Sequence, residues 1–137
     1  MKLVVDSGFL FALFNLRDPW HRNAEEFVAQ NTETLFVPNV VLPEVCYLIT
    51  RDFGHRGIET FLDYFAQLDA QFAPLEFSDL QRVRQVLSTY ADAELDIVDC
   101  CIIAIAERLD IKHIATFDRR DFSLVRPRHG EFLELLP

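Results

Sequence analysis

The sequence has few cysteines and lacks the pairings that disulfide or zinc sites need. Its three cysteines, Cys46, Cys100 and Cys101, include an adjacent pair but no Cys-x-x-Cys motif, and all lie in apolar helical patterns. This usage is typical of reduced core thiols in a cytosolic protein. The four histidines have no ligand spacing to one another or to the cysteines, which argues against a zinc site.

Long apolar runs are also absent. No stretch approaches the roughly twenty apolar residues that a membrane helix requires. The apolar start of the chain meets an acid at position 6, where a secretory segment would continue apolar. We therefore expect a cytoplasmic protein with no membrane partner.

Positive charge is scarce, and the formal net charge is −9. Affinity for nucleic acid comes mainly from phosphate neutralisation by Lys and Arg, so this charge argues against a broad nucleic-acid-coating surface. Residues 112–130 are the exception, with five basic residues and two acids, a local charge of +3 against −12 for the remainder. Such a segment is compatible with a phosphate-containing substrate, and an ordinary solvated loop explains it equally well.

The chain instead alternates short apolar strands with amphipathic helices, without a linker, a repeat or a low-complexity segment. Its 137 residues, half of them hydrophobic, predict a single domain over residues 1–137. We predict an α/β fold, an α/β/α sandwich with a central, mostly parallel sheet in strand order 3-2-1-4-5. The predicted strands are residues 2–5, 35–37, 72–75, 112–116 and 131–135. The predicted helices cover residues 7–15, 40–51, 58–68, 78–90 and 96–109, and a further helix is predicted to begin near residues 18–19.

Four acids lie where separate regular elements begin or end. Asp6 follows the first strand, Glu44 lies on the helix after the second, and Asp118 follows the fourth. Asp99 lies near the start of the most apolar helix, three residues after Asp96, and residues three apart share a helix face. Because the carboxyl ends of parallel strands meet at one edge, these side chains are expected to converge.

Convergence of four carboxylates points to a divalent cation. Two ionised carboxylates about 4 Å apart repel by roughly 4 kcal/mol at an effective dielectric near 20. Ligands that are all oxygen suit Mg²⁺ or Mn²⁺, which activate water for displacement at phosphorus. Each acid alone has an ordinary explanation as a helix cap or turn residue, and only their common location favours a metal site.

The chain resembles the PIN-domain ribonucleases, in particular the toxins of bacterial VapBC toxin–antitoxin pairs. The motifs that carry this resemblance are VVDSGFLFALFN, VPNVVLPEVCYLI, LDIVDCCIIAIAERL and IATFDRRDF. The resemblance implies that Asp6, Glu44, Asp99 and Asp118 bind Mg²⁺ or Mn²⁺ and form the catalytic site. Cys100 stands where family members usually have alanine. Asp96 is predicted as a further metal ligand, Ser7, Thr116 and Asp121 as residues that support the ligands, and Arg119 and Arg120 as substrate contacts.

The resemblance implies a metal-dependent endoribonuclease that hydrolyses phosphodiester bonds in single-stranded or looped RNA without a covalent enzyme intermediate. It also implies a cognate antitoxin protein and a homodimer. Apolar residues such as Trp20, Phe53, Phe61 and Phe65 are candidates for those contacts, although aromatic residues at helical spacing more often form core.

The sequence discriminates among three alternative functions. A phosphoacceptor receiver needs an acid at the end of the third strand, which this chain lacks, and a haloacid-type phosphatase needs a second Asp at position 8, which is glycine. Both are excluded. A catalytically silent PIN-like domain that binds RNA or a partner protein remains as the alternative function.

Overall fold

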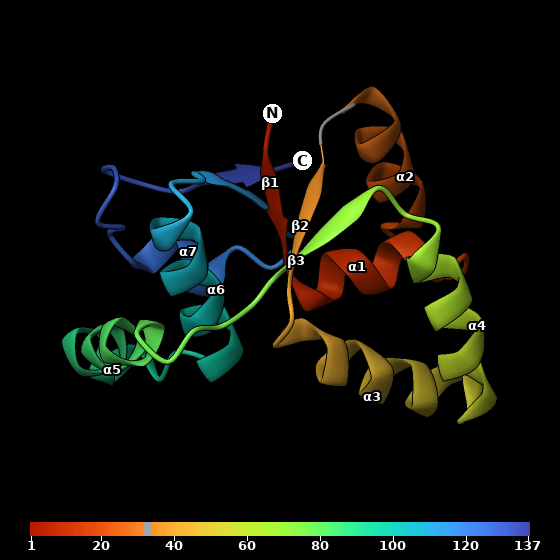
Figure 1. Cartoon of the computed structure of the whole chain (residues 1–137), viewed down its shortest axis with the longest axis horizontal. Helices are drawn as coiled ribbons and strands as arrows, with labels where there is room; N and C mark the ends of the chain where they lie inside the picture. Colours follow the sequence, from red (N-terminus) through yellow and green to blue (C-terminus); the bar gives the residue numbers. More distant parts are fainter. Residues whose placement is uncertain (32–33) are drawn as a thin grey trace.

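A five-stranded sheet forms the centre of the molecule, and all of its strands are parallel in the order β3-β2-β1-β4-β5 (Figure 1). The computed structural model describes residues 1–31 and 34–137. The predicted strand order is confirmed. The elements in chain order are β1 (Leu3–Val5), α1 (Ser7–Phe14), α2 (His21–Gln30), β2 (Leu35–Pro38), α3 (Val41–Phe53), α4 (Arg56–Ala66), β3 (Ala70–Ala73), α5 (Asp79–Thr89), the 3-10 helix η1 (Ala91–Ala93), α6 (Ile97–Arg108), β4 (His113–Ala115), α7 (Arg120–Leu124) and β5 (Glu134–Leu136).

The central strand β1 is apolar throughout because both faces of the sheet are covered. All three of its residues are fully buried, and Val4 is in register with Phe36 on one side and Ile114 on the other. A strand enclosed in this way has a continuous apolar sequence rather than an alternating one. In Figure 1, α1 to α4 lie on one side of the view and α5 to α7 on the other.

Three predicted helix starts need correction. The helix expected from Asp18-Pro19 begins at His21, because the Asp18 carboxylate accepts the Trp20 backbone N–H at 2.8 Å and closes a turn. Asn39 does not cap α3 with its side chain, since its Oδ1 accepts the backbone N–H of Leu75 at 3.0 Å. Ser78 likewise makes no side-chain capping bond to α5.

Other boundaries shift by a few residues. β3 begins two residues earlier than predicted and β5 three residues later, and the five-residue helix α7 lies within the segment predicted as a basic loop. Gly54 ends α3 with φ of 78°, a left-handed conformation that glycine adopts without a steric penalty. None of the helices within the described residues has the length and apolar content needed to cross a membrane.

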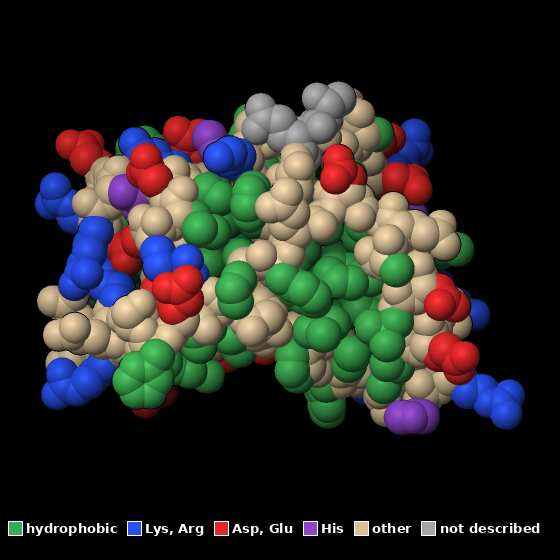
Figure 2. Space-filling view, viewed as in Figure 1, with side chains coloured by type: hydrophobic (Ala, Val, Ile, Leu, Met, Phe, Trp, Pro, Cys, Tyr) green, Lys and Arg blue, Asp and Glu red, His purple; other side chains and the backbone are tan. Residues whose placement is uncertain are grey.

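Some large apolar side chains stay at the surface. Leu62 on α4 is 46% exposed and Phe72 on β3 is 53% exposed. Figure 2 shows hydrophobic side chains gathered over β3 and the helices beside it, with charged side chains toward the rim of this face. Phe61, a candidate for a partner contact or for the core, is fully buried and belongs to the core.

Candidate active site

The carboxyl edge of the sheet carries a pocket of about 490 Å³ whose wall is mostly acidic. Seven carboxylates and one arginine line it. We call it the acidic pocket, and its lining residues are Asp6, Ser7, Gly8, Glu44, Leu48, Glu94, Asp96, Asp99, Asp118, Arg120 and Asp121. The structure thus brings together all six acids that the sequence singled out, together with Ser7 and Arg120.

Asp6 anchors the pocket at the end of β1. Its side chain is only 5% exposed, and Oδ1 accepts the backbone N–H of Phe9 at 2.8 Å, which caps α1. The Thr116 hydroxyl donates to Oδ2. That hydroxyl oxygen also accepts the Asp118 backbone N–H at 3.0 Å. One threonine therefore fixes the Asp6 carboxylate and the start of the loop that carries Asp118.

Burial makes the charge on Asp6 costly. It raises the pKa of this carboxyl from 3.8 to about 6, although the hydrogen bonds from Thr116 and Phe9 act in the opposite direction. The nearby carboxylates of Asp118 and Glu44 raise it further by repulsion. The upward shift shows that the surrounding protein supplies too little positive charge to stabilise an ionised Asp6.

Asp99 shows the same effect more strongly. Burial is the largest cause that raises the pKa of its carboxyl to about 8, followed by a hydrogen bond with Asp121 and repulsion from Asp96 and Asp6. At neutral pH the protonated form of Asp99 is therefore favoured. A divalent cation that binds Asp99 has to displace this proton.

The N-terminus of α6 is built by a second set of hydrogen bonds. Asp96 is its cap, and its Oδ1 accepts the backbone N–H groups of Val98 at 2.8 Å and Asp99 at 3.2 Å. Asp121 on α7 accepts the Asp96 N–H at 2.9 Å through Oδ2, while its Oδ1 accepts from the Arg120 guanidinium at 2.8 Å. Asp121 thereby holds α7 against the start of α6.

The two arginines predicted to contact substrate lie differently. Arg120 lines the acidic pocket, where it pairs with Asp121 and donates to the carbonyl of Ala93. Arg119 is not among the lining residues, and its guanidinium donates to the carbonyl oxygen of Pro137 at 2.5 Å. A substrate role for Arg119 requires that bond to open.

Glu94 is a lining residue that the sequence reasoning missed. It lies between η1 and α6 with φ of 50°, in the left-handed region that non-glycine residues seldom occupy. The signal in the sequence that could have identified Glu94 is its position as an acid two residues before Asp96. Its left-handed backbone, which decides where the carboxylate points, cannot be read from the residue type.

The donor set of the acidic pocket fits a hard divalent cation. Every titratable acid in its wall offers oxygen, and the buried Ser7 hydroxyl at its edge has no hydrogen-bond partner within the described chain. Among residues 1–31 and 34–137, no three His, Cys, Asp or Glu side chains already form a ready coordination group. Mg²⁺ keeps several waters and needs only one or two direct carboxylates, so the pocket fits such an ion through water as well as directly.

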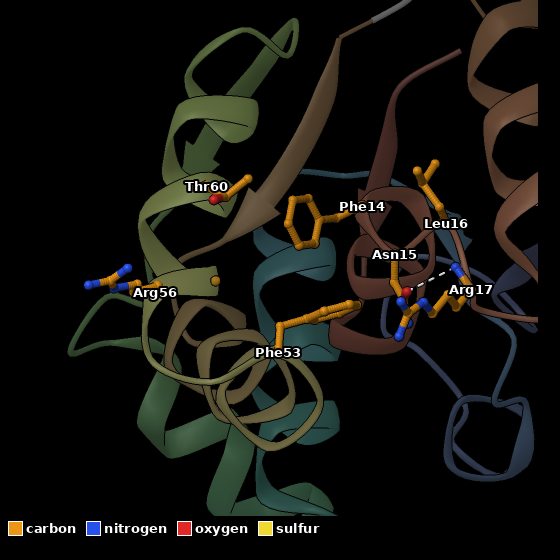
Figure 3. Close-up of a pocket in the computed structure, with 8 residues that line it drawn as sticks. Phe14, Asn15, Leu16, Arg17, Phe53, Arg56 and Thr60 are labelled. Carbon is orange, nitrogen blue, oxygen red and sulfur yellow. Dashed lines mark hydrogen bonds between the residues drawn. The ribbon is translucent and has the colours of Figure 1, made fainter.

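A second hollow of about 550 Å³ lies away from the acids, between the end of α1 and the α3–α4 corner (Figure 3). Phe14 and Phe53 face into it, and Arg17 and Arg56 lie at its edges. Among the residues that the structure describes, no carboxylate lines this hollow. The carboxylates that could hold a metal ion therefore lie in the acidic pocket, although that pocket is slightly smaller.

Known proteins share this sequence and this fold. Residues 3–126 match the family model of the PIN domain. Ribonuclease VapC26 of Mycobacterium tuberculosis is 25% identical over 135 residues, which cover 98% of this chain and all of that protein.

Among solved structures, the sarcin–ricin-loop-cleaving toxin VapC20 of Mycobacterium tuberculosis superposes with a TM-score of 0.82 at 21% identity, covering 98% of this chain and 99% of that one. A chain of a toxin–antitoxin complex from Klebsiella pneumoniae superposes with a TM-score of 0.66 at 16% identity, covering 90% and 92%. The match of the family model to most of the sequence, together with the shared sheet order, shows that this chain belongs to the PIN domain family.

Proposed function

We propose that this protein is a metal-dependent endoribonuclease that acts as the toxin of a toxin–antitoxin pair, with Mg²⁺ or Mn²⁺ as its cofactor. The observation that carries the proposal is the acidic pocket, where seven carboxylates converge and two of them have raised pKa values. A relative named as a ribonuclease and a structural neighbour named as a sarcin–ricin-loop-cleaving toxin support the choice of RNA.

In this proposal Asp6, Glu44, Asp99 and Asp118 hold the ions, with Asp96 as an additional ligand. A bound divalent ion activates water and neutralises charge that develops at phosphorus. The chain's own part is to fix the carboxylates. Thr116 orients Asp6 through its hydroxyl, and the capped N-terminus of α6 sets the position of Asp99.

The negative charge of the acidic pocket affects how RNA can bind there. The acidic pocket repels a phosphodiester unless cations compensate its carboxylates, and within residues 1–31 and 34–137 Arg120 is the only basic residue that lines it. Substrate and cation are therefore expected to bind together. None of the described residues that line the pocket is a histidine, so a histidine general base plays no part in this proposal.

The decisive experiment is RNA cleavage by the purified chain. We expect a structured RNA to be cut in Mg²⁺ or Mn²⁺, EDTA to stop the reaction, and added Mn²⁺ to restore it. Asp6→Asn and Asp99→Asn should each abolish cleavage while circular dichroism shows an unchanged fold. Asp63→Asn, which changes an exposed acid on α4, is the matched control and should cleave like the wild type.

The alternative function is a silent PIN-like domain that binds RNA or a partner protein. It predicts that wild-type protein binds RNA and leaves it intact with every metal tested. That result, obtained with folded protein and several RNA classes, would replace the nuclease proposal by the binding-module proposal.

We also propose a cognate antitoxin, a homodimer and a cytoplasmic location. The toxin–antitoxin complex among the structural neighbours supports the first, and exposed apolar side chains such as Leu62 and Phe72 are compatible with the second. Light scattering after size exclusion measures the dimer. Copurification with the product of an adjacent gene tests the antitoxin, and abundance in the soluble cell fraction tests the location.

A further inference from the structure

A column of aromatic rings runs from the core to the surface and includes Phe117, the neighbour in sequence of Asp118. Phe9 is fully buried, and Phe27 packs against it edge-on with ring centroids 6.2 Å apart. Phe117 stacks on Phe9 at 5.4 Å with 20° between the ring planes. Trp20 stacks on Phe117 at 5.0 Å with 14° between the planes and is 51% exposed. Trp20, the outermost ring of this aromatic column, is thus nearly parallel to Phe117 and accessible to solvent.

The aromatic column includes a residue of the loop that carries Asp118. Phe117 lies in the sequence between Thr116, which hydrogen-bonds Asp6, and Asp118, which lines the acidic pocket. Consecutive Cα atoms are about 3.8 Å apart, so a ring stacked on Phe117 is a close neighbour of the loop that carries Asp118. A ligand bound at Asp118 and a ligand on Trp20 can therefore belong to one molecule.

Trp20 is held in a fixed position. Its backbone N–H donates to the Asp18 carboxylate at 2.8 Å, and the ring of the next residue, His21, bonds the carbonyl of Ala12 at 2.8 Å. The first contact closes a turn within the loop, and the second attaches the residue after Trp20 to α1. An aromatic surface fixed in this way loses little conformational freedom when a flat ligand stacks on it.

We propose that Trp20 is a stacking platform for one unpaired base of the RNA, next to the phosphodiester held at the acidic pocket. The inference rests on the proposed function for its ligand, RNA. Single-stranded RNA is commonly bound by stacking splayed bases on aromatic side chains. Stacking needs no positive charge, which suits a chain with a net charge of −9 that gains little from phosphate neutralisation. A base paired within a duplex has no free face, so the platform selects unpaired segments.

The test measures binding without cleavage, in the full chain carrying Asp99→Asn and in Mg²⁺. Trp20 is the only tryptophan, so intrinsic fluorescence reports this one ring. The probe is a single-stranded oligoadenylate of about eight nucleotides, within the span of known single-strand sites. We expect the oligonucleotide to quench Trp20 fluorescence and an RNA duplex of the same length to leave it unchanged. Binding of the oligonucleotide without quenching overturns the proposal.

Substitutions give an independent measure. Trp20→Leu should weaken binding of the oligonucleotide by about 5- to 150-fold, the range that loss of one base–aromatic stack produces. Trp20→Phe should retain most of the affinity. The matched control is Phe72→Leu. It removes an aromatic side chain of similar exposure from β3, an edge strand of the sheet. Equal affinity of the folded Trp20→Leu and control variants overturns the proposal.

In an otherwise wild-type chain that cleaves RNA, Trp20→Leu should raise KM by a similar factor and leave kcat within about twofold. Loss of self-association on size exclusion with unchanged RNA affinity would identify Trp20 as a protein contact and overturn the platform. Quenching and stacking-dependent binding by a chain that never cuts RNA would overturn the nuclease proposal alone. Cleavage without quenching would overturn the platform alone.

Discussion

Replacing Asp6 by asparagine should stabilise the metal-free protein while it abolishes RNA cleavage. The pKa of Asp6 rises from 3.8 to about 6 on folding, mainly because the carboxyl is buried. The folded chain therefore binds this proton more tightly than the unfolded chain. The stability contributed by Asp6 is fully present below pH 3.8 and is lost as the pH rises through about 6.

The size of the effect follows from the shift. Roughly two pKa units at 1.36 kcal/mol each correspond to about 3 kcal/mol at pH 7.5, and the same linkage leaves only about 1 kcal/mol at pH 4.5. An asparagine amide can keep the local hydrogen bonds. Its Oδ1 would accept from Phe9, and its Nδ2 would donate to the Thr116 hydroxyl oxygen, whose hydrogen then turns to the Asp118 carbonyl, 2.8 Å from that oxygen.

Urea unfolding in EDTA, followed by circular dichroism at pH 4.5 and pH 7.5, measures this difference. We expect the gain of Asp6→Asn over wild type to grow between the two pH values, with Asp63→Asn within about 0.5 kcal/mol of wild type at both. Mn²⁺ should then stabilise the wild type and have little effect on Asp6→Asn. An Asp6→Asn variant that is no more stable than wild type at pH 7.5 refutes the reasoning about buried charge.

Three further predictions concern other residues. Because Mn²⁺ must displace the proton on Asp99, the apparent affinity of the protein for Mn²⁺ should fall as the pH drops below about 8. Calorimetry in two buffers should detect proton release near pH 7. Binding heats that do not depend on the buffer would contradict this. Arg82→Met should destabilise the fold by about 3 kcal/mol, measured by urea unfolding. The substitution leaves the Glu107 carboxylate, which is 6% exposed, without the guanidinium that donates to it at 2.7 and 2.9 Å. A change below about 1 kcal/mol would argue against this reasoning. Gly57→Ala should lower the free energy of unfolding by about 1 to 3 kcal/mol, because an added Cβ would lie 2.8 Å from Ile49 Cγ2. An unchanged melting temperature would show that α3 and α4 can move apart at this position.

The sheet and the acidic pocket were predictable because both follow from the strands. Asp6 and Asp118 come directly after short apolar runs that become neighbouring parallel strands, so topology alone places them together. Asp96 was predictable as a helix opening because an acid precedes the most apolar helical pattern, and its cap bonds confirm this. The roles of these acids as metal ligands remain predictions.

The errors arose where a side chain has two possible partners. Asn39 was predicted to cap the helix that follows it, but the fold brings Leu75 within reach, and this contact across 36 positions has no local signal. Asp18 was predicted as a helix cap and instead closes a turn. The helix α7 was missed because five residues are too few to show a helical period.

The last strand has a consequence for the acidic pocket. The Leu136 carbonyl accepts the Thr116 backbone N–H at 2.8 Å, and the Pro137 carbonyl accepts from Arg119, so residues 136 and 137 brace the loop that leads to Asp118. Thr116 in turn donates to Asp6, so a change that loosens β5 also loosens the support of two acids in the pocket. The edge strand therefore affects the geometry of a site that none of its own residues, 134–136, lines.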